Sequence, residues 1–268
     1  MHYDEFTAYV TRRGQELFRP MPWRETTDPY LIMVSELMLQ QTQVSRVVPK
    51  YEAFTAMFPT ITALRDATLE QVLQLWQGLG YNRRAKYLLA AARHVSEQYG
   101  GAMPSSVVDL QTLPGVGKNT AGAICAYAYD QPVVYVETNI RTVYLHHFFT
   151  GKTKVHDKEI ERVLALTLPD SGVREFYWAL MDYGAWLKAN GVRNIDRSSH
   201  HRKQPPLRGS IREARGAIIT HLTNGAVEIN ALEAACAQYG ERYPIALEQL
   251  IQEQMVGIEK NLVRLTNH

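Results

Sequence analysis

Residues 113–139 read LPGVGKNTAGAICAYAYDQPVVYVETN, and this stretch decides the fold of the chain. Its first five residues predict a tight turn with two glycines, Gly115 and Gly117, which can take backbone angles closed to other residues and let another chain approach closely. The apolar, small-residue segment Lys118–Tyr129 then predicts a helix. Because the first N–H groups of a helix are unpaired, this start suits a bound phosphate. The alternative is an ordinary corner between two helices in an all-α protein.

A carboxylate, Glu137, follows the hairpin about one helix later. A phosphate-binding hairpin with an acid just beyond it indicates an enzyme that holds a nucleic-acid backbone and works on the nucleotide beside it.

Three further segments agree with this interpretation, in order along the chain. They are PWR at 22–24 with DPY at 28–30, SELMLQQTQV at 35–44, and WQGLGY at 76–81 with RRA at 83–85. Together with LPGVG and TAGAI, these motifs resemble the helix-hairpin-helix DNA glycosylases of the endonuclease III superfamily, in particular the A/G-specific adenine glycosylase branch. The resemblance covers roughly residues 20–185 and implies a mainly α, two-lobed fold.

Bulk composition narrows the function without identifying it. The chain has 268 residues, enough for one to two domains, and its net charge of +2 and pI near 8.4 require any nucleic-acid surface to be a local patch. Two cysteines, Cys125 and Cys236, are too few for a disulfide framework or a four-cysteine cluster. With no signal-peptide core and no apolar span of membrane length, we expect a cytoplasmic, nucleoid-associated protein without a membrane partner.

Helical periodicity dominates as far as residue 189, and we expect a helix-hairpin-helix glycosylase domain over 1–189 with its hairpin at about 106–130. The predicted helices span residues 4–18, 30–57, 69–75, 83–99, 106–112, 118–130, 138–149, 156–167 and 173–189. Residues 190–207 are polar, basic and end in Pro205-Pro206, which predicts a linker.

Residues 208–268 form a different module. It is predicted to contain a helix over 208–222, a short strand over 226–229, helices over 231–239 and 245–253, and a β-hairpin over 255–265. This order resembles a small winged-helix domain, in which the second of the paired helices often enters a DNA groove. That helix carries Glu248 and Glu253, so a packing or partner role is an equal alternative.

The resemblance assigns the chemistry to Glu36 and Glu137. Glu36, among the apolar residues of SELML, is implied to be the general acid that protonates the leaving purine and helps to position water, because apolar surroundings raise the pKa of a carboxylic acid. The alternative is a solvent-facing helix glutamate. Glu137 stands where the family has an aspartate that stabilises or attacks the oxocarbenium-like sugar, and its extra methylene moves the carboxylate by roughly 1.5 Å. This departure implies a compensated site, an altered substrate, lost activity, or only a capping or ion-pair role.

The residue before Thr120 separates two reaction types. Lyase-type relatives place a nucleophilic lysine there to form a Schiff base with the sugar, and this chain has Asn119. Lys118 lies one residue earlier, about 100° around the helix, and is interpreted as a phosphate contact or a solvated charge. The resemblance therefore implies a monofunctional glycosylase.

The resemblance also maps the contacts with double-stranded DNA. Gln40, Gln41 and Tyr81 lie where relatives insert side chains into the duplex to fill the gap left by the extruded base, although a core aromatic is the alternative for Tyr81. The expected backbone contacts are Arg83, Arg84, Lys86 and the hairpin residues Gly115, Gly117, Lys118, Asn119 and Thr120. A basic stretch from Lys188 to Arg215 either lines the DNA path or is a solvated linker. Its cations include Arg193, Arg197, Arg202, Lys203, Arg208, Arg212 and Arg215.

Two features of the relatives are missing. Relatives hold an iron–sulfur cluster with four cysteines just after the equivalent of Met181–Gly184, and this chain has no cysteine there. We therefore expect no cofactor and no metal site. His200-His201 are not a substitute, because they lack cysteine or carboxylate partners at ligand spacing. The tail is also shorter than the domain with which adenine glycosylases recognise 8-oxoguanine.

Three hypotheses stay open for this expected monomer. It is a monofunctional glycosylase of base excision repair that acts on a lesion or mispair in double-stranded DNA, adenine favoured; a thymine or uracil mismatch glycosylase on the same scaffold; or a non-catalytic structure-specific DNA-binding protein.

Overall fold

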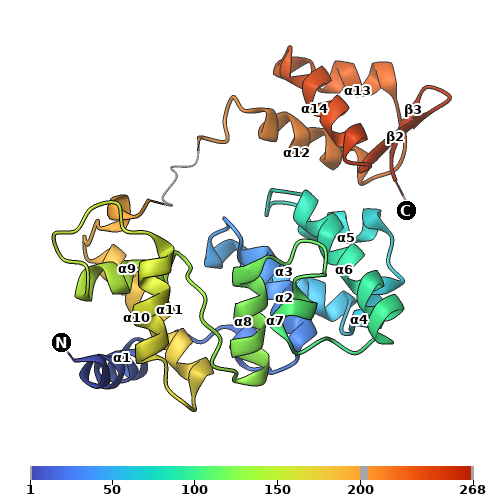
Figure 1. Cartoon of the computed structure of the whole chain (residues 1–268). Helices are drawn as coiled ribbons and strands as arrows, with labels where there is room; N and C mark the ends of the chain where they lie inside the picture. The colour runs from blue at the N-terminus through green and yellow to red at the C-terminus, as the bar shows by residue number, and fades with distance from the viewer. Residues whose placement is uncertain (1, 200–204, 267–268) are drawn as a thin grey trace. The chain divides into compact units, whose positions relative to one another are not determined.

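The computed structural model describes residues 2–199 and 205–266. The chain forms two compact units, each made of three separate segments. Unit 1 consists of Met1–Glu36, Ser105–Thr112 and Val116–Lys203, and unit 2 of Leu37–Pro104, Leu113–Gly115 and Gln204–His268. The predicted mainly α fold is confirmed (Figure 1). The domain limits placed at residues 189 and 208 stay a prediction from the sequence.

Unit 1 is built around α11 (Val173–Ala189), which packs against α1 (Tyr3–Leu17), α8 (Lys118–Tyr129) and α9 (Thr138–His147) (Figure 1). The approach of α9 to α11 requires a glycine, because a Cβ on Gly184 would lie 2.4 Å from the carbonyl oxygen of Asn139. The unit also contains the first part of α2 (Pro29–Leu39), α7 (Val107–Leu110), α10 (Asp157–Thr167) and the 3-10 turns Pro22–Arg24 and Ile195–Arg197.

A buried carboxylate joins the N-terminal segment of unit 1 to α11. The side chain of Asp182 is 1% exposed and accepts hydrogen bonds from Arg19 Nε and Arg24 Nη1, both at 2.7 Å. Arg24 is itself 4% exposed, so the pair is desolvated and both ions depend on each other. The PWR and MDYG motifs therefore include a structural ion pair.

Unit 2 begins with the end of α2 and continues through helices joined by short turns. They are α3 (Val44–Met57), α4 (Ile61–Arg65), α5 (Leu69–Trp76) and α6 (Arg83–Tyr99). Thr60 and Thr68 cap α4 and α5 with their hydroxyl groups, and Gly100 ends α6 in the left-handed conformation.

The C-terminal module of unit 2, residues 205–266, has the order of elements that the sequence predicts. The elements are α12 (Ile211–Leu222), β1 (Val227–Glu228), α13 (Ile229–Ala235), a 3-10 turn (Ala237–Tyr239), α14 (Arg242–Gln252), β2 (Val256–Glu259) and β3 (Leu262–Leu265). The three strands pair antiparallel in the order β1-β3-β2, with Val263 opposite both Val227 and Ile258. The sheet packs against α12, α13 and α14.

The predicted continuous helix over 30–57 is wrong. It is broken into α2 and α3 at residues 40–43, where Gln41 has a φ of +57° and Gln43 becomes the N-cap of α3. No glycine or proline marks this break. Its cause is Arg84, which binds the carbonyl groups at the end of α2 from a position more than forty residues later.

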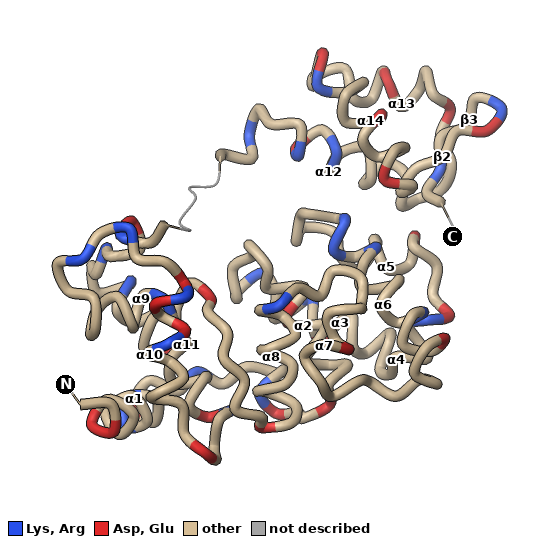
Figure 2. Tube along the Cα trace, in the orientation of Figure 1, with Lys and Arg blue, Asp and Glu red and all other residues tan. Residues whose placement is uncertain are grey.

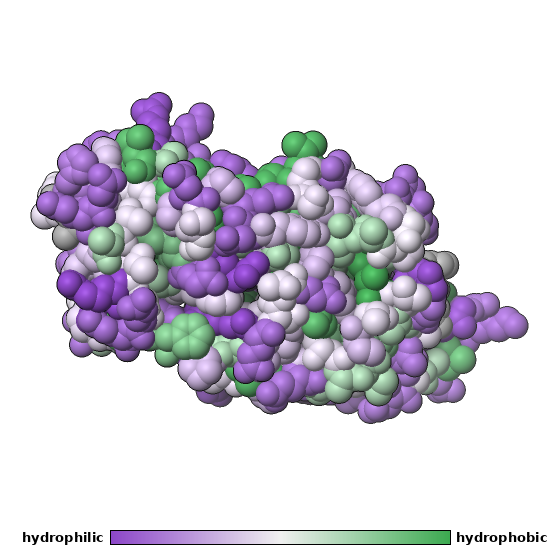
Figure 3. Space-filling model, turned by 90° about the horizontal axis from the view of Figure 1, so that it is seen from below, coloured by the Kyte–Doolittle hydropathy of each residue, from purple (hydrophilic) through white to green (hydrophobic). Residues whose placement is uncertain are grey.

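Surface charge and polarity follow the composition. Lys and Arg are interspersed with Asp and Glu along the trace (Figure 2), in agreement with the net charge of +2. On the face drawn in Figure 3, hydrophobic residues are scattered among hydrophilic ones. Across residues 2–199 and 205–266, no helix has the length and hydrophobicity needed to span a bilayer.

Candidate active site and nucleic-acid interface

Glu36 lies near the end of α2 and is half-buried between fully buried neighbours, Ser35 and Leu37. Burial, and then the negative charge of Glu137, raise the pKa of Glu36 from 4.5 to about 8. The carboxyl group therefore holds its proton at neutral pH. A protonated carboxylic acid in that position can donate a proton to a leaving group.

Glu137 is the N-cap of α9, which was one of the alternatives for this residue. Its Oε1 accepts hydrogen bonds from the backbone N–H groups of Asn139 at 2.5 Å and Ile140 at 2.9 Å. Both bonds go to Oε1, so Oε2 lies outside the cap. Burial raises the pKa of Glu137, and the two backbone hydrogen bonds and the charges of Lys188 and Arg141 oppose that rise. Capping therefore does not exclude a charge-stabilising role.

The two carboxyl groups lie close enough to influence each other, and two tyrosines share their surroundings. Tyr127 on α8 and Tyr135 before α9 are 8% and 2% exposed. Burial raises the pKa of both phenols, and the charge of Glu36 raises it further. Tyr135 also stacks on Tyr177, with ring centroids 4.5 Å apart. Sequence patterns had not indicated either tyrosine: the alternation AYAY at 126–129 is a weak signal for Tyr127, and Tyr135 stands in the separate apolar run VVYV at 133–136.

Asn119 occupies the exposed first turn of α8, where lyase-type relatives carry lysine. Its Nδ2 donates to the carbonyl oxygen of Val136 at 2.8 Å and so ties α8 to the residue before Glu137. Lys118 is 58% exposed and pairs with Glu161 at 2.7 Å, which agrees with a solvated charge. The amine whose charge reaches Glu137 is instead Lys188 on α11, whose pKa is lowered mainly by burial.

Only one of the two hairpin glycines requires a glycine backbone. Gly115 has a φ of +80°, and a Cβ there would lie 2.8 Å from Cβ of Tyr87. Gly117 has a φ of −86°, open to any residue, and a Cβ would meet no atom within 4 Å. The expectation of unusual angles is therefore wrong for Gly117. Gly117, Lys118 and Asn119 are all exposed at the start of α8, where the unpaired N–H groups of the first turn lie, and Thr120 is half-buried.

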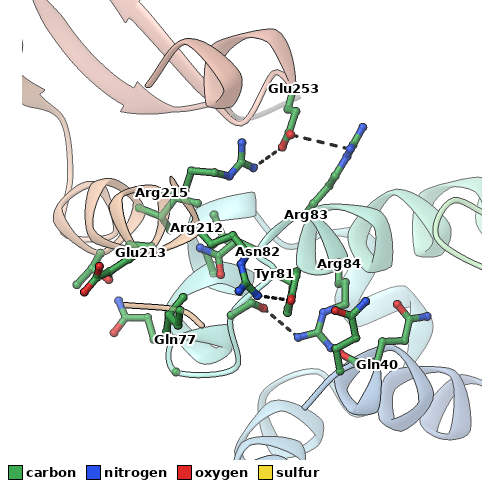
Figure 4. A pocket seen from close by; sticks show the side chains of 18 of the residues that line it. Gln40, Gln77, Tyr81, Asn82, Arg83, Arg84, Arg212, Glu213, Arg215 and Glu253 are labelled. Carbon is green, nitrogen blue, oxygen red and sulfur yellow. Dashed lines mark hydrogen bonds and ion pairs between the residues drawn. The ribbon is translucent and has the colours of Figure 1, made fainter. Parts of the chain in front are cut away.

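Six of the predicted DNA contacts line one cavity of about 760 Å³ in unit 2. They are Gln40, Gln41, Tyr81, Arg83, Arg84 and Gly115. Figure 4 shows several of them together with arginines of α12. Gln41 and Tyr81 both have left-handed backbones, with φ of +57° and +49°. Strained backbone at two residues of one cavity is typical of a functional site.

Arg84 is not available for a DNA backbone contact, contrary to the expectation. It is 7% exposed, and its guanidinium donates to five carbonyl oxygens and one hydroxyl group. Burial lowers its pKa to about 10. Lys86 donates to the carbonyl oxygens of Glu253 and Gln254, whereas Arg83 is 56% exposed and 3.9 Å from Glu253.

The basic stretch is mostly structural where it is described. Arg197 donates to the carbonyl oxygens of Phe149 and Leu145 at 2.9 and 3.0 Å, and Arg193 and Arg208 are exposed. Arg215 pairs with Glu253 at 2.6 Å. Arg202 and Lys203 lie outside the described residues.

An iron–sulfur cluster does not fit the residues present. Such clusters take four ligands, and the two cysteines, Cys125 in α8 and Cys236 after α13, are free and buried. In the described part of the chain, no group of three or more His, Cys, Asp or Glu side chains suits a metal ion. His200 and His201 lie outside that part. The segment after α11 is held by hydrogen bonds instead: Asn194 donates to Thr142 at 2.9 Å, and Val155 to Arg197 at 2.8 Å.

Known proteins resemble this chain over about two thirds of its length. It is 36% identical over 183 residues to adenine DNA glycosylase of Buchnera aphidicola subsp. Baizongia pistaciae, covering 66% of this chain and 51% of that protein. Identity with adenine DNA glycosylase of Mycolicibacterium smegmatis is 39% over 169 residues, covering 62% and 58%. The chain thus spans little more than half the length of these relatives.

Solved structures share the fold. A thermostable thymine-DNA glycosylase matches with a TM-score of 0.62 and 27% identity, covering 68% of this chain and 86% of that one. An endonuclease III in a non-covalent DNA complex matches in fold with a TM-score of 0.56 at 17% identity, covering 70% and 86%. The sequence profile of the HhH-GPD superfamily, described as base excision DNA repair proteins, matches residues 34–169. With its hairpin and paired carboxylates inside that match, the chain belongs to the HhH-GPD superfamily.

Proposed function

We propose that the protein is a monofunctional DNA glycosylase of base excision repair, which hydrolyses the N-glycosidic bond of a mispaired or damaged base, adenine first, in the double-stranded DNA of the nucleoid. The observation that carries the proposal is the pair of coupled carboxyl groups. Glu36, with its pKa near 8, is protonated at neutral pH, and Glu137 lies within electrostatic range of it.

In this mechanism Glu36 gives its proton to the departing base as the bond from the base nitrogen to C1′ of the sugar breaks. The neutral base leaves more readily than its anion would. Glu137 stabilises the positive charge that develops on the sugar through Oε2, the oxygen outside the α9 cap. Water then adds to C1′ and gives a proton to the Glu36 carboxylate, which leaves an abasic site and restores the acid.

Asn119 at the position of the Schiff-base lysine supports a reaction without a lyase step. Lys188, whose charge reaches Glu137, is the lysine against which this proposal is tested. Borohydride treatment during turnover should trap no protein–DNA adduct; a trapped adduct that disappears in Lys188→Ala would assign a lyase step to that residue. We also propose that the enzyme is a monomer without an iron–sulfur cluster, so the purified protein should be colourless, and stoichiometric iron would contradict this.

Thymine or uracil removal from a mispair is the second candidate, favoured by the likeness to the thymine-DNA glycosylase structure. One panel tests both candidates: duplexes with A, T or U opposite G or 8-oxoguanine are incubated with excess protein and then cleaved with alkali. Cleavage at adenine supports the proposal, and cleavage at T or U supports the second candidate. Tight binding without product from any duplex would leave a non-catalytic DNA-binding protein.

A further inference from the structure

Tyr81 lies on a turn whose backbone is fixed from within unit 2. The turn joins α5 to α6 and contains Gly78 and Gly80, with φ of +88° and +72°, before Tyr81 itself at +49°. Trp76 Nε1 donates to the carbonyl oxygen of Gly80 at 3.2 Å, and Arg84 donates to the same oxygen at 2.9 Å. The direction in which Tyr81 leaves the backbone is therefore set, and only its side-chain rotation remains free.

A residue of the C-terminal module removes that remaining freedom. Arg212 on α12 donates from Nη1 to the hydroxyl oxygen of Tyr81, and its guanidinium carbon lies 5.2 Å from the centroid of the ring (Figure 4). The other end of the guanidinium is held in turn, because Nη2 donates to the carbonyl oxygen of Pro205 at 2.7 Å. The ring is thus fixed at its hydroxyl group by a residue 131 positions further along the chain.

Three further contacts align the C-terminal module with α5 and α6. Gln77 Nε2 donates to the hydroxyl oxygen of Thr223 at 2.7 Å, and Gln74 to its carbonyl oxygen at 2.8 Å. At the other end of the module, Lys86 donates to the last carbonyl groups after α14. Because these contacts hold the C-terminal module against α5 and α6, they also fix the position of Arg212 over Tyr81.

The cavity beside Tyr81 has walls suited to DNA bases. Gln40 and Gln41 supply amide groups, Tyr81 an aromatic ring, and Arg212 and Arg215 guanidinium groups from the C-terminal module. Amides and guanidinium groups bind base edges, and aromatic rings stack on bases. Apolar side chains, among them Leu73, Ile211 and Ile219, line the rest of the cavity, and they suit the flat faces of bases.

We infer that Arg212 is a positioning residue for Tyr81, which it holds ready for insertion into the duplex, so that the C-terminal module is part of the surface that detects the lesion. The inference rests on the proposed function, since it requires Tyr81 to enter DNA. A side chain that is already oriented loses less conformational freedom on binding. The affinity gained in this way is expected for a distorted duplex, which accepts the ring, and not for fully paired DNA.

The experiment measures the binding of the full chain to two duplexes of one sequence, one fully paired and one with a tetrahydrofuran abasic site opposite guanine. A 2-aminopurine beside the site reports unstacking. Arg212→Ala should reduce the preference for the abasic duplex by about tenfold, an effect of about 1.4 kcal/mol. The 2-aminopurine fluorescence that reports unstacking should fall as well. Affinity for paired DNA should change less than twofold. Arg212→Lys, which still donates to the hydroxyl group, should recover part of the preference.

Coupling to Tyr81 gives the decisive comparison. The double variant Arg212→Ala with Tyr81→Ala should be no worse than Tyr81→Ala alone, because both changes remove one function. Tyr81→Phe, which loses only the hydroxyl oxygen, should reproduce part of the defect even if Arg212→Ala disturbs the fold of the module. Arg264→Ala is the matched control, an arginine of the same module that is 60% exposed and paired with Glu259.

Three results would overturn the inference. Equal losses on both duplexes would make Arg212 a phosphate contact, additive losses would uncouple it from Tyr81, and tighter binding by Arg212→Ala would show that the contact restrains Tyr81 from DNA. If the unaltered protein binds neither duplex, the proposed function fails as well. If it prefers the abasic duplex and Arg212→Ala keeps that preference, only the inference fails.

Discussion

Replacing Glu36 with glutamine removes the ionisable group and keeps the shape of the side chain. In the folded protein the pKa of Glu36 is about 8, compared with an ordinary value of 4.5. The folded state therefore binds this proton more tightly than the unfolded state. Its contribution to stability is complete below pH 4.5 and is lost as the pH rises through 8. At about 1.4 kcal/mol for each pH unit, the loss amounts to about 5 kcal/mol at most.

The assay is urea unfolding of the unaltered protein and Glu36→Gln at pH 5, 7 and 9. The glutamine variant, which cannot ionise, should gain stability relative to the unaltered protein as the pH rises, by several kcal/mol between pH 5 and pH 9. Glu97→Gln, at an exposed glutamate on α6, is the control and should follow the unaltered protein. Single-turnover base release by the unaltered protein should fall above pH 8, and Glu36→Gln should lose at least about 100-fold at every pH.

Parallel stability curves for Glu36→Gln and the unaltered protein would refute this reasoning, because Glu36 would then ionise in the folded state as easily as in the unfolded one. Full base release by the variant would refute the assignment of Glu36 as the acid, whatever the stability curves show.

Three further substitutions test other parts of the structure. Glu137→Gln keeps an oxygen for the α9 cap, so its midpoint of thermal unfolding should stay close to that of the unaltered protein while base release is lost. Glu137→Asp should hold the rate of base release if the extra methylene is merely tolerated. It should lose a large factor in rate if the site is built around glutamate. Gly115→Ala should destabilise the fold by about 1–3 kcal/mol in urea unfolding, because φ is positive there and the new Cβ would meet Tyr87; a normally stable variant would contradict this. Gly117→Ala should fold normally and weaken binding to every duplex by a similar factor, and a loss of binding confined to one mispair would contradict that statement. Asp182→Asn should cost about 3–5 kcal/mol of unfolding free energy, because it leaves the buried charge of Arg24 without its partner, and a loss below about 1 kcal/mol would show that Arg24 reaches solvent.

The sequence predicted those features that are written in neighbouring residues. Apolar spacing indicated most helices close to their observed bounds, and the glycine-bearing turn before the small-residue helix indicated the hairpin. The order of elements in the C-terminal module was predicted in the same way, since each strand and helix carries its own periodicity. The two carboxylates came from the resemblance, and the structure gives one of them a strongly raised pKa.

Only the tertiary structure decided the features that depend on distant partners. The break between α2 and α3 has no local marker, because Arg84 imposes it from α6. The same contact removes Arg84 from the predicted DNA surface, and the cap made by Glu137 could not be distinguished from a catalytic role by spacing alone. The contact of Arg212 with Tyr81 joins residues 131 positions apart. Periodicity records which face of an element is apolar, whereas buried ion pairs, caps and raised pKa values depend on which charges the fold brings together.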